Sequence, residues 1–174
     1  YKRIGFAAKN YKEGVEVTGK TLGMLGCGKI GKTLLKEIRD HEYGEVIFVQ
    51  DPAAEESVVS ACAPGAKLIR EPEDDCYAQA DLVIECATSA ALGPNLERIL
   101  KQSDLFLFSV TSFADPQFEA DARALTAKYG THIYIPHGAI LGLDGILDGR
   151  SDWESITIET TKNPASLGRD DQEY

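Results

Sequence analysis

Three closely spaced glycines constrain this chain more than any other local feature. The segment LGCGKIG places them at Gly26, Gly28 and Gly31, with the spacing G-x-G-x-x-G. An apolar segment at 21–26 precedes them, and an amphipathic pattern at 29–42 begins among them. A strand that turns directly into a helix through this spacing is typical of a dinucleotide-binding unit. Gly26 permits the tight turn, Gly28 lets a pyrophosphate approach the backbone, and Gly31 lets the helix pack on the strand.

The backbone amides at the start of the predicted helix complete this candidate phosphate site, because the positive end of the helix dipole favours anions. Cys27, Lys29 and Ile30 occupy the variable positions of the motif. We expect Cys27 and Lys29 to contribute backbone contacts. Lys29 either adds a positive charge close to the phosphates or is simply solvated. A plain structural loop is the alternative for the whole turn.

A carboxylate follows the second apolar segment at the position expected for ribose recognition. Asp51 ends the run VIFVQD and stands 20 positions after Gly31, close to the spacing of the ribose-binding acid in such units. A carboxylate there accepts hydrogen bonds from the adenosine ribose hydroxyls and repels a 2′-phosphate. We therefore predict NAD as the cofactor, with NADP as the alternative. Because Pro52 follows, an Asp-Pro turn or a helix N-cap is the competing interpretation.

Short apolar segments alternate with longer amphipathic ones through most of the chain. Each apolar segment is rich in Val, Ile, Leu or Phe, as expected for strands that are buried on both faces. This alternation predicts an α/β fold, a doubly wound parallel sheet of the Rossmann type with right-handed crossovers. The predicted strands are 21–26, 45–50, 66–69, 82–87, 104–110 and 131–136, and the predicted helices are 29–42, 53–62, 73–80, 90–102 and 115–129.

The first and last of these helices carry additional local signals. In the first, apolar residues recur at three- and four-residue spacing, which predicts one buried face. That face is expected to consist of Ile30, Leu34, Leu35 and Ile38. Before the last helix, Asp115 and Pro116 are typical of an N-cap followed by proline at the first helical position.

The alternation stops after the sixth predicted strand. The segment PHGAILGLDGILDG has four glycines, and one more strand-like run follows at 155–161. We interpret 1–20 as a lead-in segment, 21–136 as the dinucleotide-binding domain, and 137–174 as the start of an incomplete α+β substrate or catalytic domain. Because the first residue is Tyr and not Met, we expect the chain to be part of a longer gene product.

Hydroxyl-bearing residues follow the fourth and fifth predicted strands, at the edge where a doubly wound sheet binds its ligands. We expect these segments to contact the nicotinamide ribose or the carboxamide. The candidate residues are Ala87, Thr88 and Ser89 after the fourth strand, and Ser109, Thr111 and Ser112 after the fifth. N-capping of the next helix by Ser89 or Ser112 is the alternative, and both roles can coexist.

Of the three histidines, His137 is the one predicted at this ligand edge, directly after the sixth strand. There it can act as an acid, a base or a carboxylate anchor, with a structural role as the alternative. His41 stands near the end of the first helix, where a cation suits the helix dipole. His132 opens a strand, and we expect it to be partly exposed.

The overall composition excludes several function classes. The net charge is −10, and no cluster of Lys and Arg offers the basic face that a nucleic acid requires. No apolar run reaches the roughly 18 residues of a membrane span. The four cysteines lack the short spacings of zinc or redox motifs, so we predict free thiols in a reducing cytoplasm and no bound metal.

Three further segments, taken together with the turn, resemble the L-aspartate dehydrogenase family over about residues 21–167. These segments are SVTSFAD (109–115), PHGAILGLD (136–144) and TTKNPASL (160–167). Thr111 and Ser112 stand where the family has Gly-Ala, and His137 stands where it has Ser. Because these departures lie at the predicted cofactor and substrate edge, they indicate an altered choice of substrate.

The resemblance implies an enzyme that transfers a hydride from the Cα of L-aspartate, or of a similar amino dicarboxylic acid, to NAD. The product, iminoaspartate, hydrolyses to oxaloacetate or feeds NAD synthesis. The resemblance also implies that the family's catalytic histidine and a cofactor-contacting asparagine lie beyond Tyr174. Because dimers are common among such enzymes, we expect a homo-oligomer.

Two alternative functions remain at this point. The segment GVEVTGKTLGMLGCGKIGKTL is also similar to the start of the cofactor domain of D-2-hydroxyacid dehydrogenases. Those enzymes show a proline-rich turn after the fourth strand and Arg-Gly after the fifth, whereas this chain has ATSAALGPN and SVTSFAD. A non-catalytic NAD-binding or redox-sensing module is the third possibility, because the chain ends shortly after the predicted cofactor domain.

Overall fold

The computed structural model of the chain describes residues 19–136, 142–159 and 161. The chain divides into two units, Tyr1–Gly138 and Ala139–Tyr174. The described part of the first unit contains the alternating strands and helices, which define its architecture.

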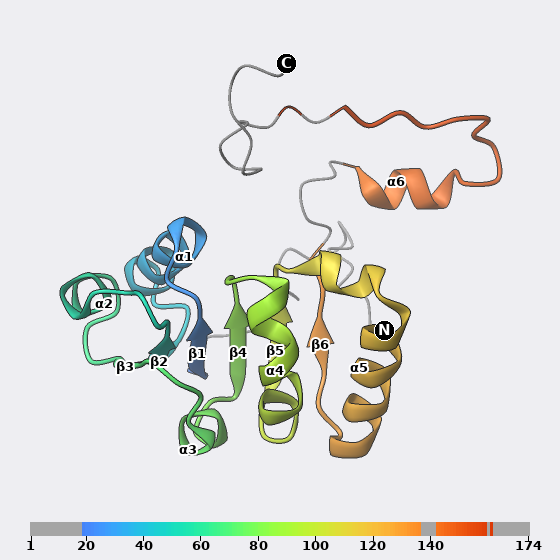
Figure 1. Cartoon of the computed structure of the whole chain (residues 1–174). Helices are drawn as coiled ribbons and strands as arrows, with labels where there is room; N and C mark the ends of the chain where they lie inside the picture. Colours follow the sequence, from blue (N-terminus) through green and yellow to red (C-terminus); the bar gives the residue numbers. More distant parts are fainter. Residues whose placement is uncertain (1–18, 137–141, 160, 162–174) are drawn as a thin grey trace, which may run out of the picture. The chain divides into compact units, whose positions relative to one another are not determined.

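Six parallel strands form the sheet of the first unit in the order β3-β2-β1-β4-β5-β6 (Figure 1). They are β1 (Thr21–Leu25), β2 (Glu45–Gln50), β3 (Lys67–Ile69), β4 (Leu82–Glu85), β5 (Asp104–Leu107) and β6 (Ile133–Tyr134). The strand order reverses between the neighbours β1 and β4, and a doubly wound sheet binds dinucleotides at such a switch point. The predicted fold class is therefore confirmed.

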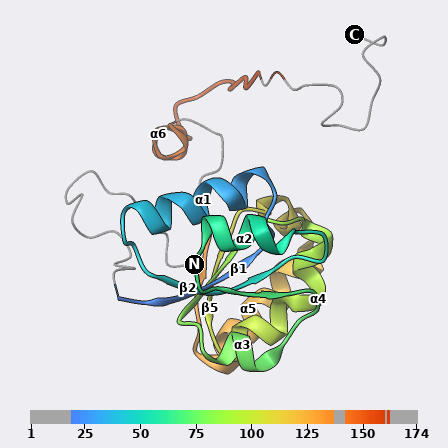
Figure 2. The same ribbon diagram turned by 90° about the vertical axis from the view of Figure 1, so that its left-hand side faces the viewer.

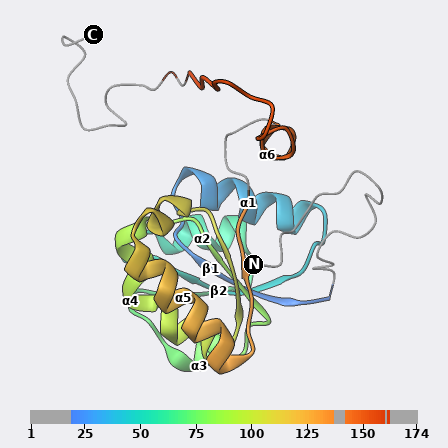
Figure 3. The ribbon, with the colours of Figure 1, turned by 90° about the vertical axis from the view of Figure 1, so that its right-hand side faces the viewer.

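Helices cover both faces of this sheet, as Figure 2 and Figure 3 show from opposite sides. One face carries α1 (Lys29–Asp40) and α2 (Glu56–Cys62), and the other carries α3 (Asp74–Ala78), α4 (Ser89–Leu100) and α5 (Pro116–Tyr129). Successive side chains of a strand point to opposite faces of the sheet and pack in two different hydrophobic cores. In β4, Leu82 and Ile84 pack in the core of α1 and α2, whereas Val83 packs in the core of α4. Burial on both faces explains why the strands are continuously apolar.

The fifth strand is shorter than predicted. It ends at Leu107, because the chain then turns: the Val110 N–H donates to the Phe108 carbonyl oxygen at 2.8 Å. A 3₁₀ helix, η1 (Val110–Ala114), follows directly. The residues predicted at the end of this strand therefore lie in a turn at the carboxyl edge of the sheet.

The buried face of α1 differs from the predicted one at Ile30. The buried residues are Gly31, Leu35 and Ile38, whereas Ile30 is 53% exposed. The buried positions follow the i, i+4, i+7 spacing, so this face begins one residue later than predicted. Ile30 therefore belongs to the surface of the glycine turn and not to the core.

Side chains cap the two helices that follow β4 and β5. The predicted cap of α5 is confirmed, since Asp115 accepts a hydrogen bond from the Gln117 N–H at 2.9 Å. Thr88 caps α4, because its hydroxyl accepts a hydrogen bond from the Ala91 N–H at 3.2 Å.

Capping by Ser89 or Ser112 was the alternative role for these two serines, and it is wrong in both cases. Ser89 is already the first residue of α4. Ser112 lies inside η1, three residues before the Asp115 cap. Neither hydroxyl therefore stands at the N-cap position that the alternative requires.

The described part of the second unit contains α6 (Leu143–Asp148) and a segment without regular structure. The Trp153 indole N–H donates to the Ile146 carbonyl oxygen at 3.2 Å. Residues 155–159 form no strand, so the strand predicted at 155–161 is wrong over the part that the structure describes. A strand requires a hydrogen-bonded neighbour, and the described residues of this unit contain no other strand.

All four cysteines are free, as predicted, and all four are buried. Within the described ranges, no group of His, Cys, Asp or Glu is arranged to hold a metal ion. No helix in those ranges is long and apolar enough to cross a bilayer.

Candidate functional site

Two glycines of the turn are required by the packing of the chain itself. Gly26 has a φ of +97°, and a Cβ added there would lie 2.8 Å from the Ala87 backbone. A Cβ added at Gly31 would collide with the Gly26 carbonyl oxygen and lie 3.2 Å from the Cys86 sulfur. A side chain at either position would therefore push α1 away from β1 and β4.

Gly28 differs from these two, because nothing in the described chain requires a glycine there. Its φ is −69°, and an added Cβ would meet no described atom within 4 Å. Gly28 is the N-cap of α1 and provides no side-chain cap, so the first amides of the helix lack that partner. Lys29 and Ile30 beside it are exposed. Open space in front of uncapped helix amides fits the pyrophosphate of a dinucleotide.

Two buried thiols pack beside the turn. The Cys86 sulfur lies 3.2 Å from the Gly26 carbonyl oxygen. Burial, followed by the charge of Glu85, raises the pKa of Cys86 to about 12. Burial, followed by the charge of Asp51, also raises the pKa of Cys27. Both thiols therefore stay protonated at neutral pH and serve packing, since the thiolate is the reactive form.

Asp51 directly follows β2 and lies beside the turn, where backbone groups hold its carboxylate. Oδ2 accepts a hydrogen bond from the Cys27 N–H at 2.7 Å. Oδ1 accepts from the N–H groups of Ala53 at 2.8 Å and Ala54 at 2.9 Å. The competing turn interpretation is therefore confirmed, and ribose recognition stays a prediction. A carboxylate has about four acceptor sites, so these three bonds leave capacity for one ribose hydroxyl.

Arg70 closes the same loop from the end of β3. Its guanidinium donates to the carbonyl oxygens of Asp51 at 3.1 Å, Pro52 at 3.2 Å and Ala54. No sequence motif singled out Arg70, because its partners lie 16 to 19 positions earlier. A guanidinium at this place bears on the choice between NAD and NADP, since arginine near the ribose acid accommodates a 2′-phosphate.

The hydroxyl-bearing segments after β4 and β5 meet at the carboxyl edge of the sheet. The hydroxyls of Ser89 and Thr111 lie 3.1 Å apart, within hydrogen-bond distance. Ser112 is buried, and its Oγ has no hydrogen-bond partner among the described residues. Ser89 and Thr111 are exposed, so they are better placed than Ser112 to meet a ligand.

Glu85, the last residue of β4, is fully buried and joins these two segments. Its Oε1 accepts hydrogen bonds from the Ala87 N–H at 2.8 Å and the Ser109 hydroxyl at 2.9 Å. Its Oε2 accepts from the Ser109 N–H at 3.0 Å. The signal of this role in the sequence is a single acid within the apolar run LVIE. The carboxylate fixes the backbone of Ala87 and Ser109, both predicted to contact the cofactor.

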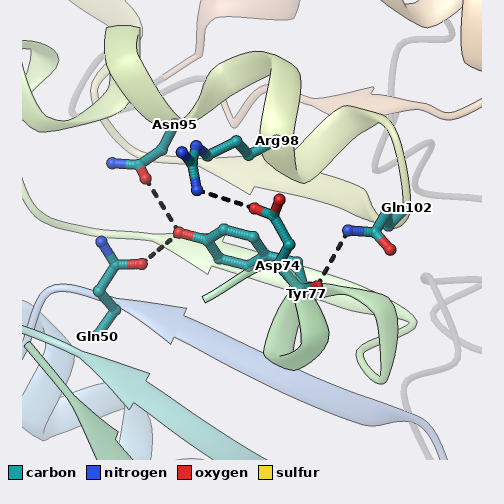
Figure 4. Close-up of polar contacts among 6 residues, drawn as sticks. All are labelled: Gln50, Asp74, Tyr77, Asn95, Arg98 and Gln102. Atoms are coloured by element: carbon teal, nitrogen blue, oxygen red, sulfur yellow. Dashed lines mark hydrogen bonds and ion pairs between the residues drawn. The ribbon is translucent and has the colours of Figure 1, made fainter. Parts of the chain in front are cut away.

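A second buried polar cluster links β2, α3 and α4 (Figure 4). The Tyr77 hydroxyl bonds to the side-chain oxygens of Gln50 and, at 3.0 Å, Asn95. Asn95 also donates to the Ala91 carbonyl oxygen at 2.8 Å. Burial raises the pKa of Tyr77 to about 12, so the hydroxyl keeps its proton and can donate it. Because Gln50 directly precedes Asp51, the cluster fixes the end of β2.

A comparison with protein families decides what this turn binds. The family described as "Homoserine dehydrogenase, NAD binding domain" matches residues 26–136. The chain belongs to this family. The match begins at the first glycine of the turn, and the NAD predicted from the glycine turn together with Asp51 is confirmed as the cofactor of this domain.

The chain, and not only this domain, is similar to L-aspartate dehydrogenases, which confirms the resemblance found in the sequence. The chain is 31% identical to the enzyme of Methanospirillum hungatei over 152 residues, 84% of this chain and 58% of the relative. It is 31% identical to the enzyme of Archaeoglobus fulgidus over 149 residues, 85% of this chain and 59% of the relative. The crystal structure of aspartate dehydrogenase from Thermotoga maritima aligns with a TM-score of 0.64 and 27% identity, covering 87% of this chain and 60% of that one. The chain therefore spans less than two thirds of these relatives.

The histidines of the NAD-binding domain lie away from its ligand edge where the structure describes them. The predicted site residue His137 lies outside the described residues, so its role stays a prediction. His41 is the C-cap of α1, with Nε2 3.4 Å from a Glu37 carboxylate oxygen. His132 is exposed and lies 3.4 Å from Asp104. Both His41 and His132 shortly precede a parallel strand, which places them at the amino edge of the sheet.

Proposed function

We propose that the intact protein is an NAD-dependent dehydrogenase that oxidatively deaminates L-aspartate or a similar amino dicarboxylic acid. This chain would supply its cofactor-binding half. The proposal is carried by an open, uncapped glycine turn in a chain that is 31% identical to an L-aspartate dehydrogenase over 84% of its length. The departures at Thr111, Ser112 and His137 are the reason for including related acids as substrates.

In this proposal the two halves of the cofactor meet different parts of the sheet edge. The pyrophosphate binds the amides at the start of α1, where Gly28 leaves room for it. Asp51 accepts one adenosine ribose hydroxyl with its remaining acceptor capacity. The nicotinamide half extends beyond β4 and β5, where the predicted contacts are Ala87, Thr88, Ser89, Ser109, Thr111 and Ser112.

When bound, NAD supplies the hydride acceptor for the Cα–H bond of the amino acid. Loss of that hydride from Cα and of a proton from the amine nitrogen leaves an imine, which water hydrolyses to the oxo acid and ammonia. His137 is the residue of this chain that we propose to take up the proton or to anchor a substrate carboxylate.

The four unpaired thiols further support a reducing, cytoplasmic location.

The direct test is to supply the intact protein with NAD and L-aspartate and to follow the absorbance of NADH. We expect NADH formation that depends on L-aspartate. Gly28→Ala should form NADH much more slowly at the same NAD concentration, whereas Gly93→Ala, an equivalent addition within α4, should match the unmodified protein. Failure to turn over any amino acid while NAD still binds would refute the proposed reaction.

A D-2-hydroxyacid dehydrogenase is the second candidate, favoured by the segment at 14–34 that is similar to the start of such cofactor domains. It predicts NADH formation with D-lactate or D-glycerate and none with aspartate. NAD binding without turnover of either class of substrate would instead favour a non-catalytic NAD-binding module.

A further inference from the structure

Glu85 is a buried carboxylate that accepts hydrogen bonds but has no cation beside it among the described residues. Its side chain is fully buried, and no ion pair to it occurs among the residues that the structure describes. The N-terminus of α4, which begins at Ser89, contributes only the partial positive charge of a helix dipole. A buried charge without a full counter-charge is costly. A positive group of a ligand would offset part of that cost.

The hydrogen bonds of Glu85 are those of an ionised carboxylate. Two of its donors are the backbone N–H groups of Ala87 and Ser109, which can only donate. They bond to different oxygens, Oε1 and Oε2, so both oxygens act as acceptors. The Ser109 hydroxyl is the third donor, to Oε1. Donors aimed at both oxygens stabilise the negative charge.

Glu85 lies at the point of the sheet where a dinucleotide crosses. It is the register partner of Leu25 in β1, the residue directly before Gly26, and of Leu107 in β5. The chain leaves β1 for α1 on one face and leaves β4 for α4 on the other, which defines the switch point. One mononucleotide half of the sheet is β1–β3 and the other is β4–β6. Glu85 therefore belongs to the half that holds the nicotinamide when the turn after β1 holds the adenosine side.

We propose that the Glu85 carboxylate makes this domain prefer the oxidised cofactor over the reduced one. The nicotinamide ring of NAD⁺ carries a positive charge, and that of NADH is neutral, so a fixed negative charge attracts only the oxidised ring. Because Glu85 is buried, its carboxylate does not touch the nicotinamide ring. Its charge acts on the ring across the segments of Ala87 and Ser109. It rests on the nicotinamide position given under the proposed function and not on the proposed substrate.

The expected size of this preference follows from Coulomb's law. With an effective dielectric constant of about 20, a unit charge about 12 Å from the ring changes the ratio of the two affinities by roughly tenfold. A role limited to holding the two segments in place would act on NAD⁺ and NADH alike. The ratio of the two dissociation constants therefore separates charge from positioning.

The test measures the dissociation constants of NAD⁺, NADH and ADP-ribose for the intact protein and for Glu85→Gln and Glu85→Asp. Glu85→Gln removes the charge with little change in shape, and we expect it to weaken NAD⁺ about 3- to 20-fold more than NADH. ADP-ribose lacks the nicotinamide ring, so its affinity should stay unchanged. Glu85→Asp keeps the charge, so the ratio of NAD⁺ to NADH affinity should stay that of the unmodified protein, even where both bind less tightly.

Ser109→Ala is the control, because it removes one hydrogen bond to Glu85 and keeps the charge. It should change the affinities for NAD⁺ and NADH by the same factor. Equal weakening of both cofactors by Glu85→Gln would overturn the proposal and leave Glu85 a positioning residue, and unchanged affinities would overturn it as well. If Glu85→Gln also weakens the binding of ADP-ribose, the result for Glu85→Asp is decisive. This variant retains the charge, so a lowered ratio of NAD⁺ to NADH affinity would contradict the proposal. A failure of L-aspartate turnover would refute the proposed reaction and not this preference.

Discussion

The two halves of the sheet shape their ligand edge by different means. In the half built on β1, the backbone path depends on Gly26 and Gly31, where missing side chains let α1 approach the sheet. In the half built on β4, the path depends on Glu85, whose carboxylate joins the segments of Ala87 and Ser109. The first half thus relies on a local absence of atoms, and the second on a polar contact between distant parts of the chain. Substitutions in the two halves should therefore fail in different ways.

Gly31→Ala should produce the largest effect in the first half. The added Cβ would collide with the Gly26 carbonyl oxygen, so α1 must shift away from the sheet. We expect the free energy of unfolding to fall by about 3 kcal/mol, as for overpacking of a rigid core, measured by urea denaturation. Gly93→Ala, at a position of α4 where an added Cβ meets no atom beyond its chain neighbours, serves as the control and should destabilise the protein far less. A Gly31→Ala variant as stable as the unmodified protein would contradict the packing role of this glycine.

Tyr77→Phe tests whether the buried cluster behind β2 supports the fold more than binding. It leaves the side chains of Gln50 and Asn95 without the hydroxyl that they share. We expect a loss of about 2 kcal/mol in the free energy of unfolding, by the same urea method, with little change in NAD affinity. A tenfold loss of NAD affinity with unchanged stability would instead assign the cluster to the cofactor site.

Asp51→Asn sharpens the comparison, because Asp51 belongs both to the turn and to the predicted ribose site. The variant keeps one oxygen for Ala53 and Ala54 and loses the charge and the acceptor facing the Cys27 N–H. We expect NAD to bind about tenfold more weakly, equivalent to about 1.4 kcal/mol, and NADP to lose less because the repulsion of its 2′-phosphate also disappears. Calorimetric titration with both cofactors checks this. An equal loss for both would leave Asp51 as a turn residue only.

Thr88→Ala should have the smallest effect of the four. It removes the side-chain cap of α4, for which we expect a loss of about 1 kcal/mol in the free energy of unfolding. Ser89→Ala is the control, since Ser89 already lies inside the helix and should cost less. Thermal unfolding of the two variants under the same condition compares their losses of stability. A greater loss for Ser89→Ala than for Thr88→Ala would show that Ser89 is the cap.

The difference between the halves also explains what the sequence could predict. The glycine turn and the parallel direction of the strands follow from spacing and periodicity, which are local properties. The contacts of Glu85 and Tyr77 are not local, since Ser109 lies 24 positions from Glu85 and Gln50 lies 27 positions from Tyr77. The sequence shows an acid inside an apolar strand but cannot show which donors the fold brings to it.

Two errors have equally specific causes. Ile30 fits the three- and four-residue spacing of α1, but Gly31 and not Ile30 approaches the sheet, so the buried face begins one position later. The segment at 155–161 has the alternation of a strand, but alternation does not supply a neighbouring strand with which to form hydrogen bonds. Periodicity therefore identified the elements, and the packing of individual residues decided their faces and partners.

Titration of NAD⁺ into Gly28→Ala and Gly93→Ala tests most directly the claim that the turn binds the cofactor. Both variants gain one methyl group at a position where an added Cβ meets no described atom within 4 Å, so both should fold as the unmodified protein does. If the pyrophosphate occupies the space in front of α1, Gly28→Ala weakens NAD⁺ by about tenfold or more, and Gly93→Ala leaves the affinity unchanged. An unchanged NAD⁺ affinity in Gly28→Ala would contradict this assignment of the turn.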